Sequence, residues 1–241
     1  MALPFRDRDD AARQLAAALV PYGDSRPVVL AIPRGGVPIG RVIADALDGD
    51  LDVILVRKLG SPGNPEIAIG AVDERGLTML NAYARWAGVD EAYIDEEARR
   101  QRALIRIRRA RYGAMDGAPE LNGRTVIVVD DGLATGSTML AALKAARAQS
   151  PAHLVCAVPV AARDSLAQVA RLADDVVCLA TPSPFKAVGR YYIRFGAVID
   201  SQVVGLLSPS HGTAGSSRPE LKTSLADMRT RGNNRASPPS A

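Results

Sequence analysis

Two adjacent acids, Asp130 and Asp131, come directly after the apolar run at 125–129 and directly before small and hydroxyl residues, in the sequence VVDDGLATGSTM. An apolar run of this length is typical of a buried strand, and polar residues at its carboxyl end lie at the edge of a sheet, where ligands bind. Carboxylates in that place accept hydrogen bonds from sugar hydroxyls. For the acids alone, a helix N-cap with a solvated acid pair is the alternative interpretation.

The residues after the acid pair suit a phosphate. They lead from Ala134 into a helical pattern, and the unpaired amides at a helix N-terminus attract anions. Gly136 can adopt backbone angles that other residues avoid, and hydroxyl donors come from Thr135, Ser137 and Thr138. The segment is neither the nucleotide P-loop nor the dinucleotide fingerprint, since Gly-Lys-Ser/Thr and Gly-x-Gly-x-x-Gly are both absent. Acids beside a phosphate cradle make a sugar phosphate the simplest ligand.

Strand-like and helix-like segments alternate around this loop. Short apolar runs predict strands at 28–32, 51–56, 125–129, 154–160 and 176–180. Helical spacing predicts helices at 11–19, 37–47, 90–111, 137–146 and 163–173. This order indicates an α/β fold with a Rossmann-like parallel sheet, flanked by helices and joined by right-handed crossovers. Because 47% of the residues are apolar and only 4% aromatic, Val, Ile, Leu and Ala must form the core.

Three further segments complete the predicted organisation. The sequence LGSPGNPE at 59–66 is crowded with Gly and Pro, which predicts a mobile loop. The runs IAIGAV and LTMLN, separated by DERG, predict a β-hairpin. The last segment, 208–241, is rich in Ser, Pro, Gly and Asn, which predicts a disordered tail after a domain at 1–207.

Composition and charge narrow the function classes. The net charge of +4 suits anionic ligands without requiring nucleic acid. A basic stripe on the helix at 90–111 fits a solvated, ion-paired face better than a nucleic-acid surface; its arginines are Arg99, Arg100, Arg102, Arg106, Arg108, Arg109 and Arg111. Cys156 and Cys178 lie in apolar runs, as expected of reduced core residues, and the two histidines lack neighbouring metal ligands. With no apolar run of about 18 residues and no secretion signal, we expect a cytoplasmic protein without a membrane partner.

The stretch VIVVDDGLATGSTM resembles the phosphoribosyl-pyrophosphate (PRPP) signature of the type I phosphoribosyltransferases. That signature has four apolar residues, two acids, a short spacer, Thr-Gly-Gly/Ser-Thr and an apolar residue. The resemblance implies that Asp130 and Asp131 are the catalytic acids and hold the ribose hydroxyls. It also implies a cradle for the 5-phosphate made by Ala134, Thr135, Gly136, Ser137 and Thr138.

Two other stretches resemble parts of the same family. AIPRGGVPIG is similar to its pyrophosphate loop, which implies leaving-group contacts from Arg34, Gly35 and Gly36. VRKLGSPGNPE is similar to the Arg-Lys pair and flexible loop of the adenine and orotate members, which adds Arg57 and Lys58 to the pyrophosphate contacts.

The acceptor side is less well marked. The resemblance implies a small, variable hood built from the N-terminal helix and the stretch at 181–207. Within it, Phe185, Lys186 and Val188 loosely resemble the purine-contacting Phe-Val-Val-Gly of the hypoxanthine-guanine enzymes, with an offset of one residue. These three residues are therefore candidate acceptor contacts, and hood packing is the alternative for Phe185.

The resemblance implies a magnesium-dependent phosphoribosyltransferase that moves the 5-phosphoribosyl group of PRPP to a nitrogen acceptor, a nucleobase or similar molecule, and releases pyrophosphate. It implies that Mg²⁺ is held mainly by substrate oxygens and water, with no protein metal site, and that the chain forms a homodimer. One alternative is a PRPP-binding regulatory protein that contacts nucleic acid through the basic stripe. A sugar-phosphate hydrolase or kinase is a third interpretation, but no motif of its own supports it.

Overall fold

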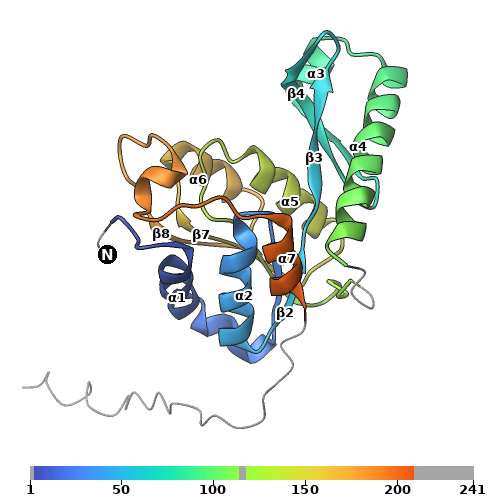
Figure 1. The fold of residues 1–241 in the computed structure, drawn as a ribbon. Helices are drawn as coiled ribbons and strands as arrows, with labels where there is room; N and C mark the ends of the chain where they lie inside the picture. Colours follow the sequence, from blue (N-terminus) through green and yellow to red (C-terminus); the bar gives the residue numbers. More distant parts are fainter. Residues whose placement is uncertain (1–2, 114–117, 209–241) are drawn as a thin grey trace, which may run out of the picture. The chain divides into compact units, whose positions relative to one another are not determined.

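Five parallel strands form the central sheet of the computed structural model, which describes residues 3–113 and 118–208. In spatial order they are β2 (Asp50–Val53), β1 (Val28–Ala31), β6 (Thr125–Val129), β7 (His153–Val160) and β8 (Asp175–Ala180). Each neighbouring pair is parallel, as the alternation of strands and helices predicts. Figure 1 labels β2, β7 and β8 of this sheet. The carboxyl ends of β1, β6 and β7 therefore meet at one edge of the sheet.

Helices cover both faces of this sheet. The first face carries α1 (Arg8–Ala18), α2 (Gly36–Leu47) and α7 (Asp200–Leu207), and the second carries α5 (Ser137–Arg147) and α6 (Arg163–Val169). Side chains of β1 alternate between the two hydrophobic clusters, with Val29 and Ala31 in the first and Val28 and Leu30 in the second. The predicted core of aliphatic residues is confirmed, and both cysteines are free, with Cys156 buried and Cys178 partly buried.

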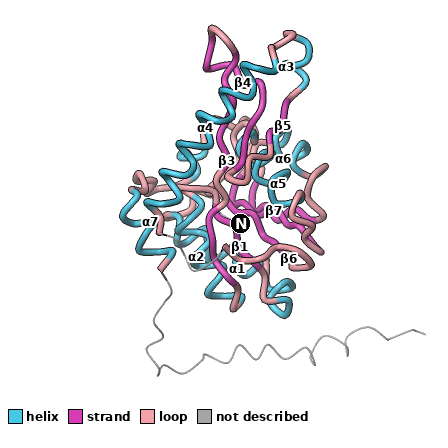
Figure 2. Tube along the Cα trace, turned by 90° about the vertical axis from the view of Figure 1, so that its right-hand side faces the viewer, coloured by secondary structure: helices cyan, strands magenta, loops and turns pink. Residues whose placement is uncertain are grey.

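An antiparallel sheet of three strands projects from β2. Its strands are β3 (Val56–Ser61), β4 (Asn64–Asp73) and β5 (Thr78–Leu80), in that order. The pairing of β4 with β5 confirms the hairpin predicted around DERG. After the short α3 (Ala82–Trp86), the long α4 (Glu91–Arg111) packs along β3 and β4 (Figure 2).

Two predicted segments differ from the structure at this point. The expected strand at 51–56 is divided between the two sheets. The Ile54 amide donates the last hydrogen bond to the parallel sheet, to the Ala31 carbonyl at 3.0 Å. Val56 then pairs with Asp73 in the antiparallel sheet. The expected loop at 59–66 is largely strand, because β3 and β4 pair through a two-residue turn at 62–63. Gly63 has a φ of 73°, and proline followed by such a glycine suits a type II turn.

The remaining differences are small. The predicted helices match within a few residues, except that α6 ends at Val169 rather than at 173. The helices α3 and α7 were not predicted. Short 3₁₀ segments, η1 (Val20–Ser25) and η2 (Val188–Tyr191), complete the structure. The described residues all belong to one compact unit. The predicted disordered tail lies, apart from Ser208, outside the described residues.

The N-terminal residues lie beside the segment at 191–194. Backbone hydrogen bonds run from Phe5 to the Tyr191 carbonyl, from Ile193 to the Phe5 carbonyl and from Arg194 to the Arg6 carbonyl, at 2.8, 2.8 and 2.9 Å. The rings of Phe5 and Tyr192 pack with their centroids 5.4 Å apart. The N-terminus thus joins the late part of the chain in a cap, hereafter the hood, defined as residues 3–8 and 185–198.

Candidate active site

The acid pair stands at the carboxyl end of β6. Asp130 Oδ1 accepts the Asp131 amide at 2.8 Å, which fixes the Asp130 side chain against its own loop. The Asp131 carbonyl accepts the Tyr192 hydroxyl at 2.7 Å, so the hood contacts the loop directly. Burial raises the pKa of Asp130 well above its usual range, and the neighbouring Asp131 charge raises it further. Burial also raises the pKa of Asp131, although Arg8 opposes that shift.

Arg8 is the functional candidate that sequence reasoning missed. Its Nε and Nη2 atoms donate to Asp131 Oδ2 at 3.0 and 2.8 Å, and its Nη1 donates to the Gly196 carbonyl at 2.7 Å. The guanidinium also lies over the Phe195 ring, 3.9 Å from its centroid. In the sequence, Arg8 belongs to RDRDD, which indicates only an acidic helix start, and nothing local links it to an acid 123 positions away.

The phosphate-binding candidate is the loop at 132–138, which ends at the N-terminus of α5. Gly136 is the N-cap residue of that helix, with a φ of 74°. Five residues form the cradle: Ala134, Thr135, Gly136, Ser137 and Thr138. Among the described residues, their amides donate no backbone hydrogen bond outside the helices and strands. These residues line a cavity of about 180 Å³ together with Asp130 and Val188. The amides are therefore available to an anion beside the acid.

Neighbouring elements fix this loop from behind. The Leu133 amide donates to the Val160 carbonyl at the end of β7, and the Ala162 amide donates to the Leu133 carbonyl, both at 2.9 Å. The Ser165 hydroxyl, at the start of α6, donates to the Ala134 carbonyl at 2.6 Å. The loop is thus fixed by hydrogen bonds at Leu133 and Ala134, while the amides of the cradle make no such bonds.

Gly35 and Gly36 lie where the loop after β1 touches the acid loop. A Cβ atom at Gly35 would be 2.0 Å from Asp131 Oδ2, and one at Gly36 would be 2.6 Å from the Val129 carbonyl oxygen. The Gly36 amide already donates to the Ile32 carbonyl at 3.0 Å, so its predicted use as a pyrophosphate donor competes with this bond. Arg34 is half exposed, with Nη1 3.8 Å from Asp200 Oδ1. Glycine is needed at both positions for close approach.

The two predicted basic residues of β3 have different surroundings. The Arg57 Nε donates to Gln101 Oε1 of α4 at 2.6 Å, and burial lowers its pKa, with a further contribution from Arg108. Lys58 instead contacts the exposed Glu66 of β4, with Nζ 3.1 Å from Oε2. Arg57 is therefore engaged in packing the hairpin on α4, whereas Lys58 is available to a ligand.

A model of the phosphoribosyl transferase domain matches residues 6–192. The chain belongs to this family. Two proteins of Mycobacterium tuberculosis, from strains CDC 1551 and H37Rv, are each 43% identical over 208 residues; the second is named "Putative phosphoribosyl transferase Rv0571c". Each match covers 86% of this chain and 47% of the relative, so the chain spans about half the length of these curated relatives.

The crystal structure of the TT1426 protein from Thermus thermophilus has the same fold. It is 46% identical, with a TM-score of 0.77, and the match covers 85% of this chain and 98% of that chain. The parallel sheet, the acid loop and the hood therefore belong to a phosphoribosyl transferase domain, as the resemblance of VIVVDDGLATGSTM implies.

The hood residues of this phosphoribosyl transferase domain divide into two groups. Val188 lines the phosphate-loop cavity, and a Cβ atom at Gly132 would be 2.7 Å from its Cγ1. Phe185 instead packs on Tyr191, with the ring centroids 5.1 Å apart, and Lys186 is exposed. Of the three candidate acceptor contacts, the structure brings only Val188 to the phosphate-loop cavity.

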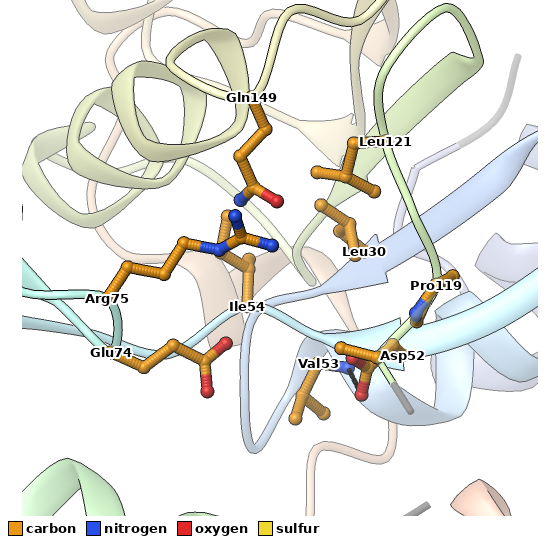
Figure 3. A pocket seen from close by; sticks show the side chains of 10 residues that line it. Leu30, Asp52, Val53, Ile54, Glu74, Arg75, Pro119, Leu121 and Gln149 are labelled. Carbon is orange, nitrogen blue, oxygen red and sulfur yellow. Dashed lines mark hydrogen bonds between the residues drawn. The ribbon is translucent and has the colours of Figure 1, made fainter. Parts of the chain in front are cut away.

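Two other cavities are lined by residues of this domain. One of about 360 Å³ lies between the start of α1, the residues at 194–198 and α7, and it is separated from Asp131 by Arg8. The other, about 120 Å³, lies at the base of the hairpin, where Arg75 points toward Gln149 and the carboxylates of Asp52 and Glu74 lie nearby (Figure 3). None of the predicted site residues lines either cavity.

The basic stripe of α4 is largely occupied by intramolecular contacts. Arg109 donates to Asp52 and to Glu74, each at 2.7 Å, and to the Val53 carbonyl at 2.9 Å. Further ion pairs join Arg99 to Glu96, Arg100 to Glu97 and Arg111 to Asp200. These contacts favour the ion-paired interpretation over a free nucleic-acid surface.

Metal and membrane features are limited. Within residues 3–113 and 118–208, no group of three or more His, Cys, Asp or Glu side chains could hold a metal ion. None of the helices in those ranges has the length and apolar character that crossing a membrane requires.

Proposed function

We propose that the chain transfers the 5-phosphoribosyl group of PRPP to a nitrogen acceptor, a nucleobase or a similar heterocycle, with release of pyrophosphate. The observation that carries this proposal is that Asp130 and the amide cradle share one cavity. A 5-phosphate on the α5 N-terminus would place the attached ribose beside the acids, because the two sites are joined by the short segment at 132–134.

The acids and the basic groups have complementary roles in this proposal. Departure of pyrophosphate leaves positive charge on the ribose ring, which the negative charge of Asp130 and Asp131 stabilises. Negative charge grows on the leaving group, where Arg34, Lys58 and the Gly35 amide are the candidate partners. Glycine at 35 and 36 lets the loop after β1 approach the acids closely.

Magnesium fits this site as an ion that arrives with its substrate. Mg²⁺ keeps several waters and binds phosphate oxygens, so the diphosphate of PRPP and water would supply most of its ligands. The ion would supply positive charge on the diphosphate. A homodimer remains an expectation from the family, and a cytoplasmic location remains an expectation from the sequence.

The test is pyrophosphate release from PRPP with Mg²⁺ across a panel of purine and pyrimidine bases, together with calorimetric titration of PRPP. We expect release that depends on one class of base. Asp131→Asn should lower turnover at least roughly tenfold, because a charge that faces the transition state is lost. The control is Asp45→Asn, which neutralises an exposed acid of α2 paired with Arg41. Failure of the wild-type chain to bind PRPP would refute the proposal.

A further inference from the structure

The contact between Arg8 and Asp131 holds the hood in place and also restricts the Asp131 carboxylate. We propose that Arg8 is a positioning residue, which clamps Oδ2 of Asp131 against Gly35 and leaves only Oδ1 to face the ribosyl group. The inference rests on the proposed function for the identity of the ligand, but the clamp itself is a property of this chain. Arg8 touches Asp131 and the hood residues Phe195 and Gly196, so it acts on the reaction through the acid.

The carboxylate of Asp131 has little freedom to move. Both side chains are mostly buried, with 14% of Arg8 and 15% of Asp131 exposed. Two charge-assisted hydrogen bonds reach the same oxygen, and Gly35 leaves no room on its other side. The carboxylate of Asp131 therefore cannot rotate to exchange its two oxygens without breaking the Arg8 contact or displacing the loop after β1.

Arg8 is itself anchored by neighbouring residues. Its third nitrogen is bound to the Gly196 carbonyl, and its face rests on Phe195. The backbone of the same segment is fixed by the Asp7 side chain, which accepts the Asp10 amide at the start of α1. A guanidinium held in this way loses little further freedom when it binds the acid, so the clamp is preorganised.

Arg8 also affects the charge of Asp131. The groups that face Asp131 from the elements around it are Arg8 from α1, Asp130 from its own loop and Tyr192 from the hood. Tyr192 is neutral, because burial and the Asp131 charge raise its pKa. Arg8 is therefore the cation that opposes the rise in pKa that burial imposes on Asp131. Without it, the pKa of Asp131 should rise further, and the site should carry less negative charge beside the ribose.

The direct test follows the ionisation of Asp131. Carbon-13 NMR of the aspartate side-chain carboxyls gives the titration midpoint of Asp131 in the wild-type chain and in Arg8→Gln. We expect the midpoint to rise by about one pH unit or more in Arg8→Gln, since an opposite charge within hydrogen-bond distance shifts a carboxylate by that amount. The matched control is Arg194→Gln, which removes another hood arginine that pairs with Asp7 and does not touch Asp131. Its Asp131 midpoint should stay at the wild-type value.

A second measurement links the clamp to the ligand. Calorimetric titration of PRPP with Mg²⁺ at about pH 6 and about pH 8 should show roughly tenfold weaker binding by Arg8→Gln at the lower pH and partial recovery at the higher pH, where Asp131 ionises again. A merely structural role of Arg8 would weaken binding equally at both pH values. Arg8→Lys keeps the charge but not the two-donor geometry, so it should retain a midpoint near wild type and bind PRPP more weakly at both pH values.

The outcomes separate this inference from the proposed function. An Asp131 midpoint in Arg8→Gln equal to that of the wild type would overturn the clamp, as would PRPP binding that is unchanged or lowered equally at both pH values. If Arg8→Gln does not fold, a wild-type PRPP affinity in Arg8→Lys overturns it instead. If the wild-type chain binds no PRPP while the midpoint shifts as expected, the proposed function fails and the clamp on Asp131 stands.

Discussion

Arg8 and Asp131 lie 123 positions apart in the chain and meet at a single carboxylate oxygen, with Nε 3.0 Å and Nη2 2.8 Å from Oδ2. On the other side of the same oxygen lies Gly35, where a Cβ atom would be 2.0 Å away. One oxygen of the acid is thus enclosed between a helix start and the loop after β1. Any atom added at residue 35 must displace the carboxylate.

The variant Gly35→Ala should therefore disturb the site more than the fold. The φ of Gly35 is −63°, which alanine adopts without strain, so the collision with Asp131 is the whole effect. We expect PRPP affinity to fall at least about tenfold, because the acid loses its position. The unfolding free energy should fall by about 1–3 kcal/mol, the usual cost of overpacking. Calorimetry and urea unfolding measure the two quantities.

Two other glycines serve as controls for this prediction. In Gly36→Ala the new Cβ would meet a backbone oxygen, that of Val129, at 2.6 Å, so this variant should lose more stability than Gly35→Ala. In Gly205→Ala, inside α7, no atom lies within 4 Å, and the variant should gain about 0.5–1 kcal/mol from helix propensity. Wild-type PRPP affinity in Gly35→Ala would contradict the enclosure of Oδ2.

The raised pKa of Asp130 predicts that ionisation of this carboxyl lowers the stability of the fold. Because burial and the Asp131 charge raise this pKa, the folded chain holds a proton at pH values where the unfolded chain does not. Stability is therefore lost as pH rises from the ordinary carboxyl pKa through the raised one. Asp130→Asn removes the charge and keeps an acceptor for the Asp131 amide. It should unfold at a higher temperature than wild type at neutral pH, and the difference should close on acidification.

Ionisation of Asp174 should instead stabilise the fold, because the hydrogen bond from Arg147 lowers the pKa of this carboxyl. Asp174→Asn should be less stable than wild type at neutral pH, and its difference should also close as acid protonates the wild-type carboxyl. Calorimetric unfolding of the three proteins between about pH 4 and pH 8 compares the two carboxyls. A lower unfolding temperature for Asp130→Asn at neutral pH would contradict a buried, like-charged pair.

The phosphate loop predicts different effects for two hydroxyls. Ser165 is buried and donates to the Ala134 carbonyl, so Ser165→Ala leaves that carbonyl without its donor and should cost about 1 kcal/mol of stability as well as PRPP affinity. Thr135 is exposed in the cradle, so Thr135→Ala should weaken PRPP binding with no loss of stability. Thermal unfolding and calorimetry of both variants separate these effects, and equal PRPP affinity in Thr135→Ala and wild type would count against the cradle.

Residues that work within one loop could be predicted from the sequence, whereas contacts between distant segments could not. The acid pair, the Gly136 turn and the start of α5 are all encoded in one stretch, so composition and spacing predict them together. Arg8 and Ser165 contact the same loop from α1 and α6. The residues next to them in the sequence give no sign of these contacts. The sequence marks Gly35 as a candidate pyrophosphate contact but does not show that it lies against Asp131, because that contact exists only after the sheet has formed.

The same limit explains the errors in the fold. An apolar run reports burial but not the sheet to which a strand belongs, so the transition from β2 to β3 at Ile54 was invisible. Gly and Pro report a turn but not its length, so the segment at 59–66 could be either a loop or a tight hairpin. The parallel sheet was predictable because alternation of strands and helices is a property of the whole chain.

Arg109 predicts a stability effect without a change in ligand binding. This residue is 24% exposed and Asp52 is 4% exposed, and burial of the guanidinium is outweighed by Glu74 and Asp52, which raise its pKa. Arg109→Met should cost about 3–5 kcal/mol, because it leaves a buried carboxylate unpaired. Arg99→Met, which breaks an exposed pair with Glu96, should change stability by less than about 1 kcal/mol. Urea unfolding compares them, and equal losses would contradict the buried network.

Lys58 and Arg57 give the last prediction, because they share a predicted role but not an environment. Lys58 is 53% exposed and its partner Glu66 is 89% exposed, and such a surface pair is weak enough for a diphosphate to replace the carboxylate. Lys58→Met should therefore weaken PRPP binding, and Glu66→Gln should strengthen it by up to about threefold, since the competing charge is gone. Arg57→Met should instead lower the unfolding temperature, because Gln101 loses its partner between β3 and α4. Calorimetric PRPP titrations decide the assignment, and weaker PRPP binding by Glu66→Gln would show that Glu66 does not compete with the ligand for Lys58.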